Sequence, residues 1–259
     1  MESKLDISIF QIDLAYKDKE ANLNLIEKLS NKISKTDLIL LPEMFNTSFI
    51  TDDINISEDM NGPTISWMRS LAEQKKCSVS GTILIKQENH FYNRLIWVNN
   101  DQQIFYYDKS HLFSLANEDK HLSKGKNKII INLNGWKICP LICYDIRFPV
   151  FCRNTENYDV LIFLSSWPEK RIDAWDVLLK ARSIENQCYA IGVNRTGKDN
   201  NGFLFPGHSS VYDSLGNTLL DLSTERNVVK KITLDKNELS LRRRQLQFLK
   251  DMDDFKISQ

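Results

Sequence analysis

Three short runs with solidly apolar interiors constrain the fold of this 259-residue chain more than any other feature. They are DLILLP (residues 37–42), PLICY (140–144) and DVLIFL (159–164). A strand with one wet face alternates apolar and polar residues, whereas a strand covered on both faces is apolar along its length. The runs therefore predict buried strands that have a helix layer or a second sheet on each side.

The rest of the chain predicts helices around a large set of strands. Residues 20–33, 63–76 and 174–187 have the apolar spacing of amphipathic helices, and about a dozen extended segments surround them. So many strands exceed one open sheet, and no linker divides residues 1–259, so we expect a single α/β domain of two packed sheets with outer helices. The residues expected to face the core in the first and third helices are Leu23, Ile26, Leu29, Ile33, Trp175, Leu178, Leu179 and Ile184.

The balance of charge limits the classes of partner. The chain has 34 basic and 34 acidic residues, so neither a nucleic-acid backbone nor an anionic membrane is the expected main partner. The basic cluster at residues 242–244 is interpreted as a solvated turn rather than a docking patch. No apolar run approaches the roughly 18 residues of a membrane span, and the N-terminal residues lack the apolar centre of a signal peptide. We therefore expect a cytoplasmic protein.

The cysteines predict neither a disulfide framework nor a zinc site. Their number is odd, no CxxC pair occurs, and a chain of this length folds without covalent cross-links. Most of the thiols are therefore expected to be small buried apolar groups, and no metal or other cofactor is expected. The five residues are Cys77, Cys139, Cys143, Cys152 and Cys188.

Three predicted strand ends carry residues that are unusual there. Glu43 follows DLILLP, Lys109 follows QIFYYD, and Cys143 follows PLI. Ligands of α/β proteins commonly bind beyond the carboxyl ends of strands, so the three side chains can share a pocket. The alternative is structural: Glu43 and Lys109 would form a buried ion pair, and Cys143 would fill the core.

The chemistry of these residue types makes the functional interpretation specific. A thiol is mostly protonated at neutral pH, so a nucleophilic Cys143 needs a base, and Glu43 can take the proton. Attack on a carbonyl or nitrile carbon then places negative charge on oxygen or nitrogen. The ammonium of Lys109 and the backbone N–H of Tyr144 would stabilise that charge.

At these residues the chain resembles the nitrilase superfamily of carbon-nitrogen hydrolases, and within it the omega-amidase branch. The superfamily uses a Glu-Lys-Cys triad, and three segments of this chain resemble its triad motifs in the same order. They are LPEMFNTSF (41–49), YDKSHLFSLANE (107–118) and CYDIRFP (143–149). The likeness continues through SSWP (165–168), ARSIENQCYAIGVNRTG (181–197), GHSSVYDSLGN (207–217) and RRRQLQFLKDMDDF (242–255), so it covers nearly the whole chain.

The resemblance implies a four-layer α-β-β-α sandwich that pairs into homodimers, with the C-terminal tail (about residues 240–259) at the dimer interface. It implies that Glu43 is the general base, Lys109 the oxyanion stabiliser and Cys143 the nucleophile. It also implies a second glutamate, placed here at Glu118. A carboxylate beside Lys109 would keep the ammonium charged and oriented, although an acid in the polar loop of residues 110–127 can also be simply solvated.

Substrate contacts are expected from four further residues. In related carbamoylases an arginine at the position of Arg147 holds the substrate carboxylate, a task that suits a planar guanidinium. Alternatively, Arg147 pins the cysteine loop or the dimer face. Phe113, Trp167 and Phe45 are candidates for the walls of a narrow apolar slot, or else they belong to the core.

Histidine offers a rival mechanism. Cys143 with His111 or His208 would form a papain-like dyad, although both histidines also fit framework positions of the family.

The resemblance implies an amidohydrolase that cleaves the ω-amide of 2-oxoglutaramate or 2-oxosuccinamate through a thioester on Cys143. Alternatives are a hydrolase of aliphatic amides, N-carbamoyl compounds or nitriles, and a catalytically silent binding protein of the same fold. True nitrilases usually carry Trp-Glu after the cysteine, where this chain has Tyr144 and Asp145, which argues against nitriles.

Overall fold

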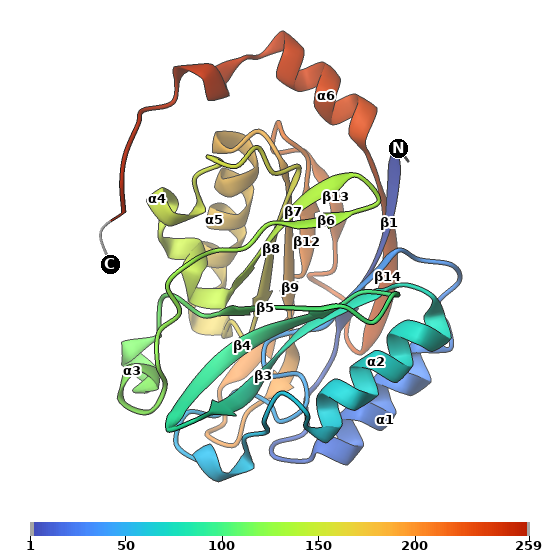
Figure 1. Cartoon of the computed structure of the whole chain (residues 1–259), viewed down its shortest axis with the longest axis vertical. Coiled ribbons are helices and arrows are strands. Elements are labelled where there is room, and N and C mark those ends of the chain that lie inside the picture. The colour runs from blue at the N-terminus through green and yellow to red at the C-terminus, as the bar shows by residue number, and fades with distance from the viewer. Residues whose placement is uncertain (1–2, 258–259) are drawn as a thin grey trace.

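The computed structural model describes residues 3–257, which form two six-stranded sheets packed face to face (Figure 1). The strands of the first sheet, in spatial order, are β14 (Val228–Asp235), β1 (Lys4–Gln11), β2 (Leu38–Leu40), β3 (Ser78–Gln87), β4 (His90–Val98) and β5 (Ile104–Asp108). Those of the second are β13 (Thr218–Asp221), β12 (Ser210–Tyr212), β9 (Tyr189–Asn194), β8 (Val160–Ser165), β7 (Trp136–Ile142) and β6 (Ile131–Leu133). A separate short ribbon pairs β10 (Thr196–Lys198) with β11 (Leu204–Pro206).

The centre of each sheet is parallel and the edges are antiparallel. Strand β2 pairs in parallel with β1 and β3, and β8 pairs in parallel with β7 and β9. Strands β2, β7 and β8 overlap the three apolar runs, and the residues of the runs that lie in these strands are all buried. The prediction of buried strands at these runs is therefore confirmed, as is the single-domain α/β sandwich.

Helices cover the outer face of each sheet. Helices α1 (Lys19–Ser30) and α2 (Pro63–Lys75) lie side by side on the first sheet, and α5 (Ile172–Glu185) covers the second (Figure 1). The inner faces of the two sheets meet in one large apolar core, which gives the layer order α-β-β-α. The remaining helices and 3₁₀ turns are η1 (Ile54–Ile56), η2 (Ser114–Ala116), α3 (Glu118–His121), η3 (Cys143–Arg147), α4 (Pro149–Cys152), η4 (Glu169–Arg171), α6 (Lys236–Gln245) and η5 (Phe248–Asp251).

One helix residue faces the wrong way for its prediction. The side chains of Trp175 and Leu179 on α5 are fully buried, but Ile184 is 45% exposed. Ile184 lies five positions after Leu179, which rotates it by roughly 140° around an α-helix. Ile184 therefore lies off the buried stripe, and its inward placement was wrong.

The triple-arginine cluster is also different from its prediction, because it lies in the last turn of α6 rather than in a turn. The helix begins after Asp235, whose side chain accepts a hydrogen bond from the N–H of Asn237 (2.8 Å). Within the cluster, Arg243 donates to the carbonyls of Gln187 (2.8 Å) and Tyr158 (2.6 Å). Basic residues suit a helix C-terminus, and Arg243 ties α6 to the domain.

Among residues 3–257 no helix is long and apolar enough to cross a membrane. The segment of residues 110–127, expected to be a long loop, contains two single-turn elements, η2 and α3. All five cysteines are buried free thiols. The fold thus leaves the loop after β5, together with the loops after β2, β7 and β8, to form the site.

Candidate active site

The ends of strands from both sheets meet at one point. Glu43 follows β2, and the backbone N–H of Glu43 donates to the carbonyl of Ser165 at the end of β8 (3.4 Å). In return, the N–H of Ser166 donates to Glu43 Oε2 (2.8 Å). Lys109 follows β5, and Cys143 follows β7. The site therefore lies across the two sheets, at the carboxyl ends of their central strands.

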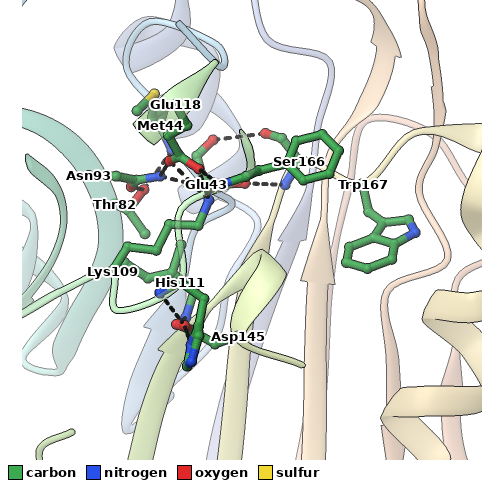
Figure 2. A network of polar contacts seen from close by, with 12 residues as sticks. Glu43, Met44, Thr82, Asn93, Lys109, His111, Glu118, Asp145, Ser166 and Trp167 are labelled. Atoms are coloured by element: carbon green, nitrogen blue, oxygen red, sulfur yellow. Dashed lines mark hydrogen bonds and ion pairs between the residues drawn. The ribbon is translucent and has the colours of Figure 1, made fainter. Parts of the chain in front are cut away.

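Glu43, Lys109 and Glu118 form a buried charge cluster (Figure 2). Lys109 Nζ donates to Glu43 Oε1 (2.8 Å) and to both carboxylate oxygens of Glu118 (3.0 and 2.9 Å). The three side chains are 0%, 1% and 0% exposed, respectively. Glu118 Oε2 also accepts the backbone N–H of Phe113 (2.7 Å). The expected placement of Glu118 beside Lys109, rather than in solvent, agrees with this geometry.

The electrostatics of the cluster follow from burial and from its excess of negative charge. Burial alone opposes the charged ammonium, but Glu118 and Glu43 outweigh it and raise the pKa of Lys109 above its ordinary value. Burial also raises the pKa of Glu118, against the opposing attraction of Lys109. Lys109 is therefore held as a fixed cation between two carboxylates.

An amide side chain completes the cluster. Asn93 Nδ2, from β4, donates to Glu43 Oε1 (2.8 Å) and to Glu118 Oε1 (3.1 Å). Its Oδ1 accepts from Thr82 Oγ1 (2.9 Å), which in turn accepts the N–H of Met44 (2.8 Å) (Figure 2). The sequence analysis missed Asn93, although an asparagine inside an otherwise apolar strand was an available signal.

Cys143 occupies a conformation that is unusual for its residue type. Its φ is +41°, in the left-handed region, at the point where β7 turns into η3. Such a conformation costs roughly 1–3 kcal/mol and tends to occur at functional sites. Cys143 is 8% exposed, whereas the other four cysteines are 2% exposed or less. Cys143 is thus set apart from the core thiols by both its backbone and its access.

The thiol of Cys143 is held in its protonated form. Burial raises its pKa well above the ordinary value, and the charge of Glu43 raises it further, while Lys109 acts in the opposite direction. Burial likewise raises the pKa of Cys77 to about 12, with Asp37 acting in the same direction and Lys75 in the opposite one. A reaction at Cys143 therefore needs proton transfer during attack, because a standing thiolate is disfavoured.

Asp145 fixes the turn that carries Cys143. Its buried carboxylate accepts hydrogen bonds from the hydroxyl of Tyr107 (2.8 Å) and the N–H of Ile142 (3.0 Å). It also contacts the N–H and Nδ1 of His111 (3.1 and 2.8 Å) (Figure 2). Asp145 thereby ties the cysteine turn of one sheet to the end of β5 in the other. The sequence analysis gave Asp145 no such role.

The two histidines of the rival dyad have other partners. His111 contacts Asp145 and stacks on Phe148 with ring centroids 3.6 Å apart. His208 contacts the carboxylate of Asp176 (3.0 Å). Neither imidazole lines the cavity that holds Cys143. The geometry therefore favours Glu43 over His111 or His208 as the base.

A cavity of about 480 Å³ opens onto the site. Of the four predicted substrate contacts, Arg147, Phe113 and Trp167 line it, but Phe45 does not. Phe45 is fully buried in the core beneath α1 and α2 and packs on Trp67, with ring centroids 5.9 Å apart. Its predicted place in the wall of the slot was wrong, because its side chain packs into the apolar core between the first sheet and helices α1 and α2. The polar and charged lining residues include Glu43, Lys109, Cys143, Tyr144, Arg147 and Arg171.

Among residues 3–257, no group of three or more His, Cys, Asp or Glu side chains is arranged to hold a metal ion. The site instead combines a thiol, a carboxylate and an ammonium around one cavity. The sequence model of the carbon-nitrogen hydrolase family matches residues 6–244. The chain belongs to this family.

Relatives within the carbon-nitrogen hydrolase family share most of the chain. The omega-amidase YafV of Yersinia enterocolitica is 38% identical over 216 residues, which are 83% of each protein. The 2-oxoglutaramate amidase of Bacillus subtilis is 34% identical over 88% of this chain and 90% of its own. A superfamily protein from Xanthomonas campestris, solved with an arsenic adduct in its active site, superposes with a TM-score of 0.96 at 35% identity over the whole of both chains. As a carbon-nitrogen hydrolase, the protein acts on carbon-nitrogen bonds other than peptide bonds.

Proposed function

We propose that this carbon-nitrogen hydrolase cleaves the ω-amide of small 2-oxo dicarboxylic acid monoamides, such as 2-oxoglutaramate and 2-oxosuccinamate. The products are the 2-oxo dicarboxylic acid and ammonia. The observation that carries the proposal is the meeting of Glu43, Lys109 and Cys143 at one cavity. The choice of substrate is supported by relatives named omega-amidase and 2-oxoglutaramate amidase, which match most of this chain.

In the first half of the reaction, Cys143 Sγ attacks the amide carbon while its proton passes to the carboxylate of Glu43. Negative charge develops on the amide oxygen, where Lys109 Nζ and the backbone N–H of Tyr144 stabilise it. Glu43 then returns the proton to the amide nitrogen, the C–N bond breaks, and ammonia leaves. The acyl group remains on Cys143 as a thioester.

In the second half, a water molecule enters the position that ammonia has left. Glu43 takes a proton from this water as the oxygen attacks the thioester carbon. The same two donors stabilise the second oxyanion, the C–S bond breaks, and the thiol of Cys143 regains its proton. Glu118 and Asn93 position the reacting groups, because Glu118 accepts a hydrogen bond from Lys109 and Asn93 donates one to Glu43.

Arg147 is the proposed anchor for the substrate carboxylate. It lines the cavity four residues after Cys143, and its guanidinium lies 4.9 Å from the ring centroid of Trp167. An arginine at a fixed distance from the nucleophile would measure the length of the acyl chain. Phe113 and Trp167 form part of the apolar wall.

Ammonia release from a panel of amides tests the proposal. The panel contains 2-oxoglutaramate, 2-oxosuccinamate, an N-carbamoyl amino acid, an uncharged aliphatic amide and a nitrile. We expect the highest kcat/KM for the two 2-oxo acid amides and no ammonia with the Cys143→Ala variant. A preference for any other member of the panel would assign the alternative chemistry, and no turnover of any member by the parent would favour a silent binding protein.

We also infer a homodimer in which the C-terminal tail contributes to the interface. The tail follows α6 and passes along the side of the domain where α4 and α5 lie (Figure 1). It presents exposed apolar side chains at Phe248, Phe255 and Ile257, and α4 and α5 expose Val150 and Ile184. Light scattering of the full chain and of a chain ending at residue 251 tests this, since removal of the tail should shift the mass toward the monomer.

We also propose a cytoplasmic location, which the reduced cysteines support. All five thiols are free, and disulfides are rare in the cytosol.

A further inference from the structure

Two arginines of the cavity wall have no hydrogen-bond acceptor in the part of the chain that the structure describes. Among the hydrogen bonds and ion pairs of residues 3–257, none involves the guanidinium of Arg147 or Arg171. Arg182 and Arg195, by contrast, are buried arginines whose guanidinium groups bind carbonyl and side-chain oxygens. An arginine carries five N–H donors, so two unpaired guanidinium groups in one cavity need an explanation.

The two side chains are held in place by aromatic groups rather than by acids. Arg147 ends η3 and lies over Trp167, and Arg171 ends η4 and lies over Phe113, each 4.9 Å from the ring centroid. Trp167 also donates its indole N–H to the carbonyl of Arg171 (2.7 Å), so one residue supports both arginines. Stacking on aromatic rings orients a guanidinium and leaves its N–H edge free for a ligand.

The electrostatics of Arg171 are those of a cation without a partner. Partial burial lowers its pKa, and repulsion from Arg147 lowers it further, while the negative charge of a Cys143 thiolate would act in the opposite direction. The two guanidinium groups line one cavity and repel each other. An anion bound between them would relieve the repulsion.

The other charges of the cavity do not neutralise this pair. Lys109 is already bound by Glu43 and Glu118. The carboxylate of Asp199 accepts the N–H groups of Asn201 (3.0 Å) and Phe203 (2.8 Å). Asp52 lines the cavity as well, but it forms no ion pair with either arginine. The free positive charge thus lies on the η3 and η4 side of the cavity.

We propose that Arg171 is a second anchor residue, which together with Arg147 forms a guanidinium pair for the 2-oxo acid end of the substrate. The inference rests on the proposed function and extends it. A 2-oxo acid offers three acceptor oxygens on adjacent carbons, which two guanidinium forks can bind together. A 2-amino acid such as glutamine instead brings an ammonium into a cationic site and removes one acceptor. Arg171 therefore selects 2-oxo acid amides against amino acid amides.

Kinetics of Arg171→Gln test the inference on four substrates of similar length: 2-oxoglutaramate, glutaric acid monoamide, glutamine and pentanamide. We expect kcat/KM for 2-oxoglutaramate to fall about 30-fold or more, mainly through KM, because removal of one partner of a partly desolvated charge contact costs at least that much. Pentanamide should change less than about threefold, and the preference for 2-oxoglutaramate over glutamine should narrow.

Lys170→Gln is the matched control. Lys170 precedes Arg171, lines the same cavity and carries the same charge, but its ammonium lies over Phe203, 5.3 Å from the ring centroid. We expect this variant to stay within about twofold of the parent on all four substrates. If kcat/KM for 2-oxoglutaramate falls equally in the two variants, Arg171 contributes only to the general positive potential of the cavity. If Arg171→Gln lowers kcat/KM for pentanamide as much as for 2-oxoglutaramate, Arg171 has a structural role. Either result overturns the inference.

Calorimetric binding of 2-oxoglutarate separates this inference from the proposed function. In a Cys143→Ala background, the product should bind, and the added Arg171→Gln change should weaken binding about 30-fold or more. Turnover of 2-oxoglutaramate with unchanged product binding in the Arg171 variant would overturn the inference and leave the function standing. Arginine-dependent binding by a protein that hydrolyses none of the amides would overturn the function and leave the anion site standing.

Discussion

Charged side chains are paired on one side of the cavity and unpaired on the other. On one side, Glu43, Lys109 and Glu118 are almost completely buried, and Lys109 donates to both carboxylates. On the other side, Arg147 and Arg171 are half-buried and bind no acceptor within residues 3–257. Cys143 lines the same cavity as both groups, and the charges of Glu43 and Lys109 act on its pKa in opposite directions.

The Glu43–Lys109–Glu118 cluster has its hydrogen-bond partners within the protein, whereas the two arginines are free to bind a ligand. A buried charge with a full set of partners is fixed before substrate arrives, which favours stabilisation of a transition state. An unpaired guanidinium stacked on an aromatic ring is oriented but unsatisfied, which favours recognition of an anion. Substitutions on the two sides should therefore have different effects on stability and on specificity.

The largest effect on turnover is expected at Cys143, which lines the cavity together with both groups. Cys143→Ala should retain the fold and reduce turnover of 2-oxoglutaramate by about 10⁴-fold or more, because the covalent intermediate cannot form. Coupled ammonia detection measures the loss. The core thiols give matched controls: Cys139→Ala and Cys152→Ala should stay active, since both side chains are fully buried in the apolar core. Near-parental turnover by Cys143→Ala would remove it from the mechanism.

Lys109→Ala tests the side of the cavity where Lys109 is paired with Glu43 and Glu118. We expect kcat to fall about 100- to 1,000-fold or more, because the oxyanion loses one of its donors. The same change leaves Glu43 and Glu118 buried without their cation, which should cost about 3–5 kcal/mol in the free energy of unfolding. Steady-state kinetics and urea unfolding measure the two effects. An unchanged kcat in folded protein would show that Lys109 has only a structural role.

Arg147→Ala tests the side with unpaired arginines, where we expect a large effect on specificity and a small effect on stability. We expect kcat/KM for 2-oxoglutaramate to fall about 30-fold or more, with little change for an uncharged amide of similar length. The free energy of unfolding should change by about 1 kcal/mol or less, because only the contact with Trp167 is lost. Equal losses on charged and uncharged amides, or a large loss of stability, would contradict the comparison.

The smallest effect concerns the reactivity of the thiol rather than turnover. Glu43 raises the pKa of Cys143, so Glu43→Gln should lower that pKa while Lys109 remains nearby. Alkylation of Cys143 by iodoacetamide, followed by mass spectrometry across pH, should therefore show a midpoint at lower pH than in the parent. Asp52→Asn, at another position of the cavity wall, is the control and should leave the midpoint unchanged. A midpoint that stays or rises in Glu43→Gln would contradict the electrostatic account of the site.

Local pattern was enough to predict the framework of the site. The apolar runs at residues 37–42, 140–144 and 159–164 predicted buried central strands, because only strands covered on both faces are apolar throughout. The unusual residues that follow predicted strands, Glu43, Lys109 and Cys143, were expected to share a pocket, and they line one cavity. The motif resemblance supplied Glu118, which contacts Lys109.

Other features depended on contacts that local pattern does not encode. Phe45 and Phe113 both follow strands as aromatic residues, yet only Phe113 reaches the cavity, because the direction of each side chain depends on the turn that carries it. Ile184 lies beyond the buried stripe of its helix, where a one-residue change of phase decides exposure. Such errors arise because spacing fixes a period better than it fixes the end of an element.

The sequence by itself determined the layered fold, the strand ends that carry the chemistry, and the identity of the three proposed reacting residues. Only the tertiary structure decided which partners surround them. Ser166 binds Glu43 across 123 positions of the chain, and Asn93 binds it across 50. Arg171 lines the same cavity as Cys143, and its guanidinium has no acceptor among residues 3–257. The Ser166–Glu43 contact joins the two sheets, and the Asn93–Glu43 contact joins two segments of the first sheet. Both contacts follow from how distant segments pack together and not from the pattern within any one segment.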